Sequence, residues 1–217
     1  SDTLAALVGG KYGSIKFEVE GNVKSLEGSV VFFFVTFLCI HLPLLLMTDI
    51  GRAESVLIAF IIALLVTGFE AISLSGSDNI FVPFGTYYIL AKMTRHSLPV
   101  IVWQTEILLM IIVAAAFVYE HPRILKVSGL IGAVLINYAS LSLCNFYWFL
   151  PLFLAQAMFY IMINAYIHRE GKEKLASFQI KVLLYTGIIP ILLIFAANMA
   201  KTPDAIYVPY IAAVVSQ

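Results

Sequence analysis

The polar segment at residues 1–28 combines the residue types that a phosphate-binding site needs. Closely spaced glycines alternate with lysines, and carboxylates stand near both ends; the residues are Gly9, Gly10, Gly13, Lys11, Lys16, Lys24, Asp2 and Glu27. Glycine permits backbone angles closed to other residues and lets a ligand approach the main chain. Backbone N–H groups and lysines bind phosphate oxygens, and carboxylates bind divalent metal ions. The pattern therefore predicts a site for a metal-bound nucleoside triphosphate.

A second interpretation of the same segment stays open. The segment is not a Walker A loop, because Gly10-Lys11 is followed by Tyr12 rather than by serine or threonine. An interfacial loop, in which the lysines contact lipid head groups and the glycines only form turns, accounts for the same composition. Both interpretations place the segment at a water boundary.

Another polar patch, FEAISLSGSDN, follows at residues 69–79 and contains Glu70, Asp78 and Asn79. Acidic groups near the ends of membrane helices are costly and usually face a partner or a wet cavity. Pro83 comes next, inside a short apolar segment, where we expect it to break or kink a helix and free backbone groups that only a buried site tolerates. An ordinary loop with an Asp-Asn helix cap is the alternative.

The elements that must position these two patches are membrane helices. The 217-residue chain is 61% hydrophobic and 12% charged, with a mean hydropathy of +0.97. Soluble domains are about half apolar and about a quarter charged. A net charge of zero gives no support for a nucleic-acid partner. We therefore expect an all-α fold, a polytopic transmembrane helical bundle.

Eight apolar segments are candidates for membrane crossings, since a spanning helix needs about 20 mainly apolar residues. Six are long, at residues 29–47, 55–72, 99–118, 125–143, 146–167 and 180–199, and two are shorter, at residues 80–93 and 205–215. The sequence thus predicts about seven or eight membrane segments. Because the chain starts in the middle of a polar segment and ends inside an apolar one, we expect a fragment that is truncated at its N-terminus.

The basic residues predict an orientation, since cytoplasmic loops carry the excess of lysine and arginine. If all eight segments cross and residues 1–28 are cytoplasmic, nine of the 13 basic residues are cytoplasmic: Lys11, Lys16, Lys24, Arg123, Lys126, Arg169, Lys172, Lys174 and Lys181. The other four, Arg52, Lys92, Arg95 and Lys201, lie outside. This topology returns the patch at residues 69–79 to the side of residues 1–28, so we expect the two patches to converge.

Together, the two patches resemble the motifs of the polyprenol kinase family, which includes dolichol kinase and phytol kinase. The first motif is D-x-x-A-x-x-x-G, a second glycine four residues on, and K-[ST]-x-E-G; it is matched by Asp2, Ala5, Gly9, Gly13, Lys24, Ser25, Glu27 and Gly28. The second is an acidic residue that closes a helix, followed by D-N-x-x-x-P; it is matched by Glu70, Asp78, Asn79 and Pro83. The resemblance covers residues 1–95, which we expect to form a catalytic region. Residues 96–217 show no motif of the family and are expected to form an additional membrane region of unknown role.

The resemblance implies phosphoryl transfer from CTP to the hydroxyl of a long isoprenoid alcohol of the phytol, dolichol or farnesol type. It implies Mg²⁺ ligation by Asp2, Asp78 and Glu70, and catalytic roles for Asp78, Lys24 and Glu27. It implies contacts with CTP from Gly9, Gly10, Lys11, Gly13, Lys16, Lys24, Ser25 and Asn79. The expected protein is integral to the membrane and multi-pass, with its active site facing the cytoplasm and membrane lipid around it. Whether it forms a homodimer is left open.

Two other functions stay open at this point. The related CDP-diacylglycerol synthases, which are CTP:phosphatidate cytidylyltransferases, share a similar K-[KR]-T-x-E-G arrangement, although here Val23 precedes Lys24-Ser25. A membrane transporter or channel would instead use Glu106, a carboxylate within the segment at 99–118, together with membrane Asn and Gln residues. The first alternative predicts a different product from CTP, and the second predicts a function that depends on Glu106 rather than on Asp2.

Overall fold

The computed structural model describes residues 2–19, 22–73, 78–119, 127–170, 180–200 and 204–216. Within these ranges the chain is helical apart from one short two-stranded sheet, so the all-α expectation is confirmed in outline. The chain divides into two compact units, Ser1–Leu109 and Met110–Gln217. The sequence predicted a catalytic region at residues 1–95 and an additional membrane region at residues 96–217. That division concerns function rather than packing, and it stays a prediction.

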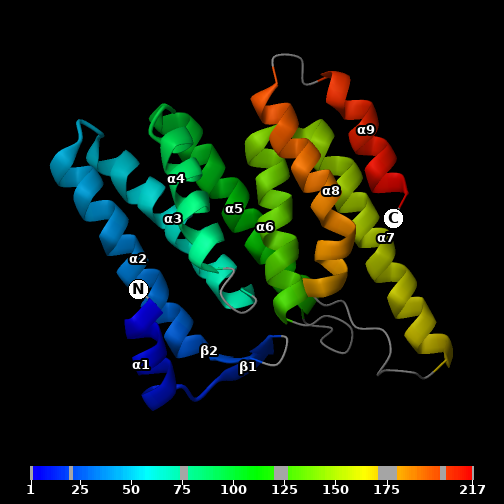
Figure 1. The fold of residues 1–217 in the computed structure, drawn as a ribbon, viewed down its shortest axis with the longest axis horizontal. Helices are drawn as coiled ribbons and strands as arrows, with labels where there is room; N and C mark the ends of the chain where they lie inside the picture. The colour runs from blue at the N-terminus through cyan, green and yellow to red at the C-terminus, as the bar shows by residue number, and fades with distance from the viewer. Residues whose placement is uncertain are drawn as a thin grey trace. The chain divides into compact units, whose positions relative to one another are not determined.

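Nine helices and two strands make up the described part of the chain (Figure 1). The first unit contains α1 (Asp2–Tyr12), β1 (Lys16–Val19), β2 (Asn22–Ser25), α2 (Leu26–Met47), α3 (Arg52–Ile72), α4 (Asp78–Met93) and the beginning of α5 (Leu98–Tyr119). The second unit contains the end of α5, then α6 (Val127–Leu143), α7 (Phe146–Glu170), α8 (Ile180–Met199) and α9 (Asp204–Val215). Each of the eight apolar segments identified in the sequence is a helix.

Three helices of the described part are long and apolar enough to cross a membrane: α2, α3 and the stretch Leu98–Phe117 of α5. At 1.5 Å per residue, the 22 residues of α2 span about 33 Å, which matches a hydrocarbon core of about 30 Å. The 17 residues of α6 reach only about 26 Å. Helix length and composition therefore support three membrane-spanning helices and do not support a count of seven or eight.

A ridge of exposed apolar side chains winds along α2. Val30, Phe34, Leu38, Leu42 and Leu46 are all exposed, and they recur every four residues. Residues four apart lie above one another on the same helix face. A continuous exposed apolar surface marks a contact with a membrane or a protein partner. The ridge is the kind of surface that a membrane helix turns toward lipid.

The helices α2 and α3 form an antiparallel pair (Figure 1). Near the loop that joins them, His41 Nδ1 lies 2.9 Å from Ser55 Oγ. Farther from the loop, the rings of Phe33 and Phe60 make an edge-to-face contact with centroids 5.9 Å apart. The α3 helix supplies most of the core of this unit, through the buried residues Ile58, Ala59, Ile61, Ile62, Ala63, Leu65 and Val66. The antiparallel packing brings the start of α2 and the end of α3 to the same end of the pair.

The hairpin of β1 and β2 was not expected from the sequence. The strands pair antiparallel, with Lys16 opposite Ser25 and Val19 opposite Asn22. Val19 is fully buried, whereas Lys16 and Glu18 are exposed, as in a strand with one buried face. The hairpin turns the chain back, so that β2 leads directly into α2.

The second unit is held together by polar and aromatic contacts between its helices. Asn137 Nδ2 of α6 donates to Gln156 Oε1 of α7 at 2.7 Å. The hydroxyl of Tyr210 in α9 donates to the carbonyl of Trp148 in α7, and the two rings lie 4.7 Å apart. These contacts join α7 to both α6 and α9.

Candidate functional site

Three glycines of the first motif allow α1 and the start of α2 to touch. A Cβ atom placed on Gly9 would lie 2.5 Å from Ser25 Oγ and 3.3 Å from Gly28 Cα. A Cβ atom on Gly13 would lie 2.9 Å from the same Oγ, and one on Gly28 would lie 3.0 Å from the carbonyl oxygen of Ala5. A Cβ atom at Gly9 or Gly13 would force a neighbouring atom to shift, and one at Gly28 would make a tight contact. The small residues of the motif therefore build a close contact between two helices.

This packing corrects one expectation about the glycines. Gly9 and Gly10 lie inside α1, and neither they nor Gly13 has a φ in the left-handed region. Residues within an α-helix use their N–H groups for the helix itself, and Gly13 N donates to Gly9 O at 3.1 Å. The expectation that these glycines form turns with N–H groups free for a ligand is therefore wrong in this structure. Their contact with a nucleotide stays a prediction.

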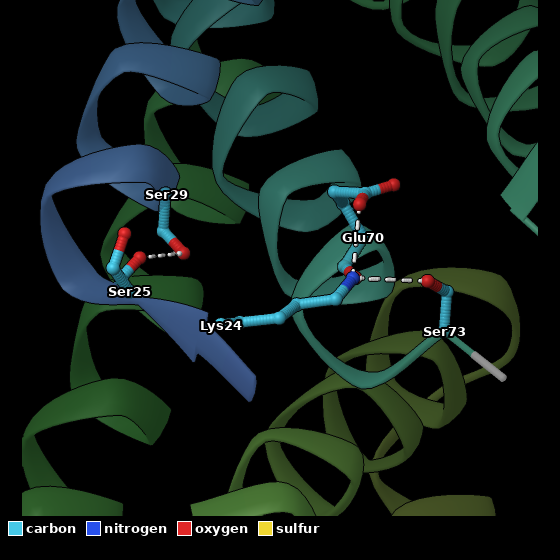
Figure 2. A network of polar contacts seen from close by, with 5 residues as sticks. All are labelled: Lys24, Ser25, Ser29, Glu70 and Ser73. Carbon is cyan, nitrogen blue, oxygen red and sulfur yellow. Dashed lines mark hydrogen bonds and ion pairs between the residues drawn. The ribbon is translucent and has the colours of Figure 1, made fainter. Parts of the chain in front are cut away.

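Ser25 sets the start of α2. Its backbone is extended, with φ −121° and ψ 147°, and its Oγ accepts a hydrogen bond from Gly28 N at 3.1 Å. This is the geometry of a helix N-cap. Ser29 Oγ in turn donates to the Ser25 carbonyl at 3.2 Å (Figure 2). The Ser25 side chain is buried, so this member of the motif orders the helix terminus from within the α1–α2 contact.

Lys24 extends from the end of β2 to the C-terminal end of α3 (Figure 2). Its Nζ lies 2.9 Å from Glu70 Oε1 and donates to Ser73 Oγ at 3.1 Å. It also donates to the backbone carbonyl of Glu70. The side chains of Lys24 and Glu70 are 22% and 18% exposed, so water still reaches the pair. The Lys24 ammonium thus donates hydrogen bonds to three oxygens at the C-terminal end of α3.

The same contact stabilises the end of α3. Ser73 is the C-cap residue, and both its N–H and its hydroxyl donate to the Glu70 carbonyl. A positive charge at a helix C-terminus is favourable because the backbone carbonyls there carry a partial negative charge.

The contact between Lys24 and Glu70 confirms the predicted convergence of the two polar patches at these two residues. Lys24 and Glu70 define the candidate site.

Glu27 has one anchored and one unpartnered carboxylate oxygen. Its Oε1 accepts hydrogen bonds from Ser14 N at 2.8 Å and Ile15 N at 3.2 Å, and the Ser14 hydroxyl also donates to it. Its Oε2 is buried without a hydrogen-bond partner among the residues that the structure describes. A carboxylate oxygen in that position is chemically suited to a cation, because carboxylate oxygens are the usual ligands of Mg²⁺.

Three other predicted residues lie away from the Lys24–Glu70 contact. Asp2 is exposed in the first turn of α1, and Lys16 is exposed on β1. Lys11 is exposed, with its Nζ 5.3 Å from the centroid of the Tyr12 ring. Within the ranges described above, none of the three shares a hydrogen bond or ion pair with Lys24 or Glu70.

Asp78 and Asn79 are the first two residues of α4. Their side chains lie outside the described residues, so their predicted roles are neither supported nor contradicted. The sequence predicted that Pro83 would break or kink a helix. The helix continues through Pro83, so a break is wrong, and a kink stays a prediction. Proline's fixed φ is compatible with a helix, and the loss is confined to one backbone hydrogen bond and local strain.

The metal set also stays a prediction. Among the side chains that the structure describes, no group of three or more His, Cys, Asp or Glu residues gathers. Glu70, one of the predicted ligands, is paired with Lys24. The side chain of Asp78, another predicted ligand, lies outside the described part.

Two site residues were missed by the sequence reasoning, Ser14 and Ser73. Each contacts a predicted functional residue directly: Ser14 contacts Glu27, and Ser73 contacts Lys24. Their positions offered a weak signal, since Ser14 follows the Gly13 at the end of one helix and Ser73 follows the last apolar residue of another. Serine hydroxyls at helix ends often bond to the backbone.

Of the residues named for the transport alternative, Glu106 lies on α5 together with Gln104. Glu106 is exposed, whereas the neighbouring Gln104 is buried and its Oε1 has no hydrogen-bond partner in the described part of the chain.

Comparison of the chain with protein-family models, with curated proteins and with solved structures finds no match.

Proposed function

We propose that the chain is part of a membrane-bound, CTP-dependent kinase that phosphorylates the hydroxyl of a long-chain isoprenoid alcohol. One observation supports this proposal above the others. Lys24 of the K-S-x-E-G motif contacts Glu70 of the second patch, 46 residues away in sequence, with 2.9 Å between Nζ and Oε1. The two patches resemble motifs of the polyprenol kinase family, and on that resemblance Lys24 and Glu70 would contribute to one site. A single site requires that these two residues lie close together.

Carboxylates are assigned to the metal ion in this proposal. Asp2, Asp78 and Glu70 would hold Mg²⁺, with Glu27 as a further candidate because its buried Oε2 has no donor among the described residues. When bound, Mg²⁺ supplies positive charge that offsets the charge of the nucleotide phosphates. The remaining residues of the first motif would bind CTP, with Lys24 as the principal cation.

The reaction in this proposal is a direct phosphoryl transfer. The alcohol oxygen forms a bond to the γ-phosphorus of CTP as the bond from that phosphorus to the bridging oxygen breaks, which gives CDP and a lipid phosphate. The hydroxyl proton passes to a carboxylate, which we assign to Asp78. The Lys24 ammonium offsets charge on the transferred group. Positioning and electrostatics account for most of the rate of such reactions, so no covalent nucleophile is needed.

We also propose a multi-pass topology of seven or eight membrane segments with the site on the cytoplasmic face. The excess of basic residues in alternate loops supports this orientation. In sealed vesicles, a membrane-impermeant maleimide should label Lys16→Cys and Asp49→Cys from opposite sides, in a chain whose Cys39 and Cys144 have been replaced. Labelling of both positions from the same side would contradict a crossing by α2.

The function is tested by product analysis with the full-length protein, CTP, Mg²⁺ and a panel of phytol, farnesol, geranylgeraniol, dolichol and phosphatidate. A kinase releases CDP and places the γ-phosphate on the alcohol. A cytidylyltransferase releases pyrophosphate and leaves cytidine on the lipid, and that result would replace our proposal with the synthase alternative.

A matched pair of variants tests the site itself. Lys24→Ala should abolish transfer, whereas Arg52→Ala should leave transfer intact, because Arg52 lies at the opposite end of α3 from Glu70. Normal turnover in Lys24→Ala would refute the assignment of the site. Transfer that survives Asp2→Asn but is lost in Glu106→Gln would favour the membrane region around α5 as the functional centre.

A further inference from the structure

We propose that Lys24 and Glu70 are exchange partners, so that a phosphate arriving at Lys24 and a divalent cation arriving at Glu70 each break the ion pair and bind cooperatively. This inference rests on the proposed function for the identity of the ligands. It concerns a different property, namely the coupling between the anion and the cation at this site.

The first argument is the number of hydrogen-bond donors. A lysine ammonium has three N–H donors and no acceptor. Lys24 Nζ has three acceptors within reach: Glu70 Oε1 at 2.9 Å, Ser73 Oγ at 3.1 Å and the Glu70 carbonyl. A phosphate oxygen can therefore receive a hydrogen bond from Lys24 only after one of these oxygens has been released.

The second argument is the charge that surrounds each group. The Glu70 carboxylate offsets the positive charge that would attract a phosphate to Lys24. Conversely, a divalent cation that approaches Glu70 meets an ammonium 2.9 Å from Oε1. When both ligands bind, the lysine pairs with the phosphate and the carboxylate pairs with the cation, so one ion pair is replaced by two. Each ligand must then raise the affinity of the other by the same factor.

The position of the pair allows such an exchange. The two side chains are 22% and 18% exposed, so a ligand reaches them from water without unfolding the core. Partly exposed ion pairs are weak, and removing one changes an equilibrium constant by about two- to fivefold. A phosphate or a metal ion can compete with a pair of that strength.

The test is the affinity of inorganic pyrophosphate, with and without Mg²⁺, for the full-length protein in lipid nanodiscs, measured by calorimetry. Glu70→Gln keeps the shape of the side chain and removes its charge. We expect the Kd for pyrophosphate without Mg²⁺ to fall about two- to fivefold, and the gain in affinity from Mg²⁺ to shrink by the same factor. Unchanged far-ultraviolet circular dichroism serves as the check on folding.

Two serine variants separate the exchange from general loosening of the site. Ser73→Ala removes one acceptor of Lys24 without a change in charge, so it should tighten metal-free binding in the same direction by a smaller factor. Ser29→Ala is the matched control, because Ser29 bonds to the Ser25 carbonyl and not to Lys24 (Figure 2). It should leave both affinities unchanged.

The outcomes distinguish this inference from the proposed function. Weaker metal-free binding in Glu70→Gln would show that the pair is only a structural anchor, even if the wild-type protein is an active kinase. Cooperative binding that is lost in Glu70→Gln, in a protein that does not turn over CTP, would support the exchange and refute the kinase. The absence of pyrophosphate binding to the wild-type protein would overturn both.

Discussion

Alanine at Gly9 should loosen the contact between α1 and α2, whereas alanine at Gly10 should not. The two glycines are adjacent in the same helix, so both substitutions gain the same helix propensity. They differ in the space available. A Cβ atom on Gly9 would lie 2.5 Å from Ser25 Oγ, whereas one on Gly10 would have no atom within 4 Å.

The magnitude follows from three contributions. Alanine is favoured over glycine inside a helix by about 1 kcal/mol, which both variants gain. Overpacking at Gly9 costs about 1–3 kcal/mol. If Ser25 Oγ moves away to make room, its N-cap bond to Gly28 is lost at a further cost of about 1 kcal/mol. We therefore expect Gly10→Ala to be neutral or more stable than the wild type, and Gly9→Ala to lie about 1–4 kcal/mol below Gly10→Ala.

The assay is equilibrium unfolding in mixed micelles, combined with hydrogen exchange at the amides of α1. A second background sharpens the test. Ser25→Ala removes the oxygen that Gly9→Ala would meet, so the cost of Gly9→Ala should fall by about 1 kcal/mol when the two are combined. Equal stability of the two glycine variants, or additive effects in the double variant, would refute the close contact between the helices.

Three further predictions concern contacts elsewhere in the chain. Asn137→Leu and Gln156→Leu should each destabilise the second unit by about 0.6–1.7 kcal/mol, and a double-mutant cycle should show strong coupling, because the two amides share one hydrogen bond between helices. Tyr210→Phe should cost about 0.5–1.5 kcal/mol in unfolding measurements, because it removes the hydrogen bond to α7 and keeps the ring contact. Glu27→Gln should accelerate hydrogen exchange at the amides of residues 14–15, since the charge of their acceptor is removed; unchanged exchange there would mean that the carboxylate does not hold this turn.

Eight of the nine described helices could be predicted from the sequence because they are apolar segments, whereas α1 lies in the polar segment and was not among them. All eight apolar segments became helices, and the boundaries moved by only a few residues, as where α3 begins at Arg52 rather than at residue 55. The number of membrane crossings could not be predicted in the same way. A segment near the limiting length is helical whether or not it spans the bilayer, so hydropathy alone does not separate the two cases.

The hairpin was missed although its signal was present. Lys16, Phe17, Glu18 and Val19 alternate between polar and apolar, which is the pattern of a half-buried strand. The only functional prediction made for this stretch was that Lys16 contacts CTP. The alternation of polar and apolar residues predicts the structure of this stretch better than the motif match does.

The convergence of the two patches could be predicted from topology, but the chemistry of the contact could not. Antiparallel helices bring the start of α2 near the end of α3, and this placed Lys24 and Glu70 together. A sequence motif identifies a residue but does not identify the residue that its side chain contacts. Glu70 therefore looked like a metal ligand, and only the structure shows that its carboxylate pairs with Lys24 and that Ser73 completes the contact.

Under the proposed function, the ridge of α2 would give an isoprenoid chain a lateral route from the bilayer to the polar site. Val30, at the near end of the ridge, lies five residues beyond Ser25, which is about 7.5 Å along a helix. A flexible hydrocarbon tail lying along the ridge would then end within about two helical turns of Ser25, the residue next to Lys24. Substrate delivery by this path would need no enclosed tunnel, and tails of very different length would end at the same point, with the excess left in the lipid.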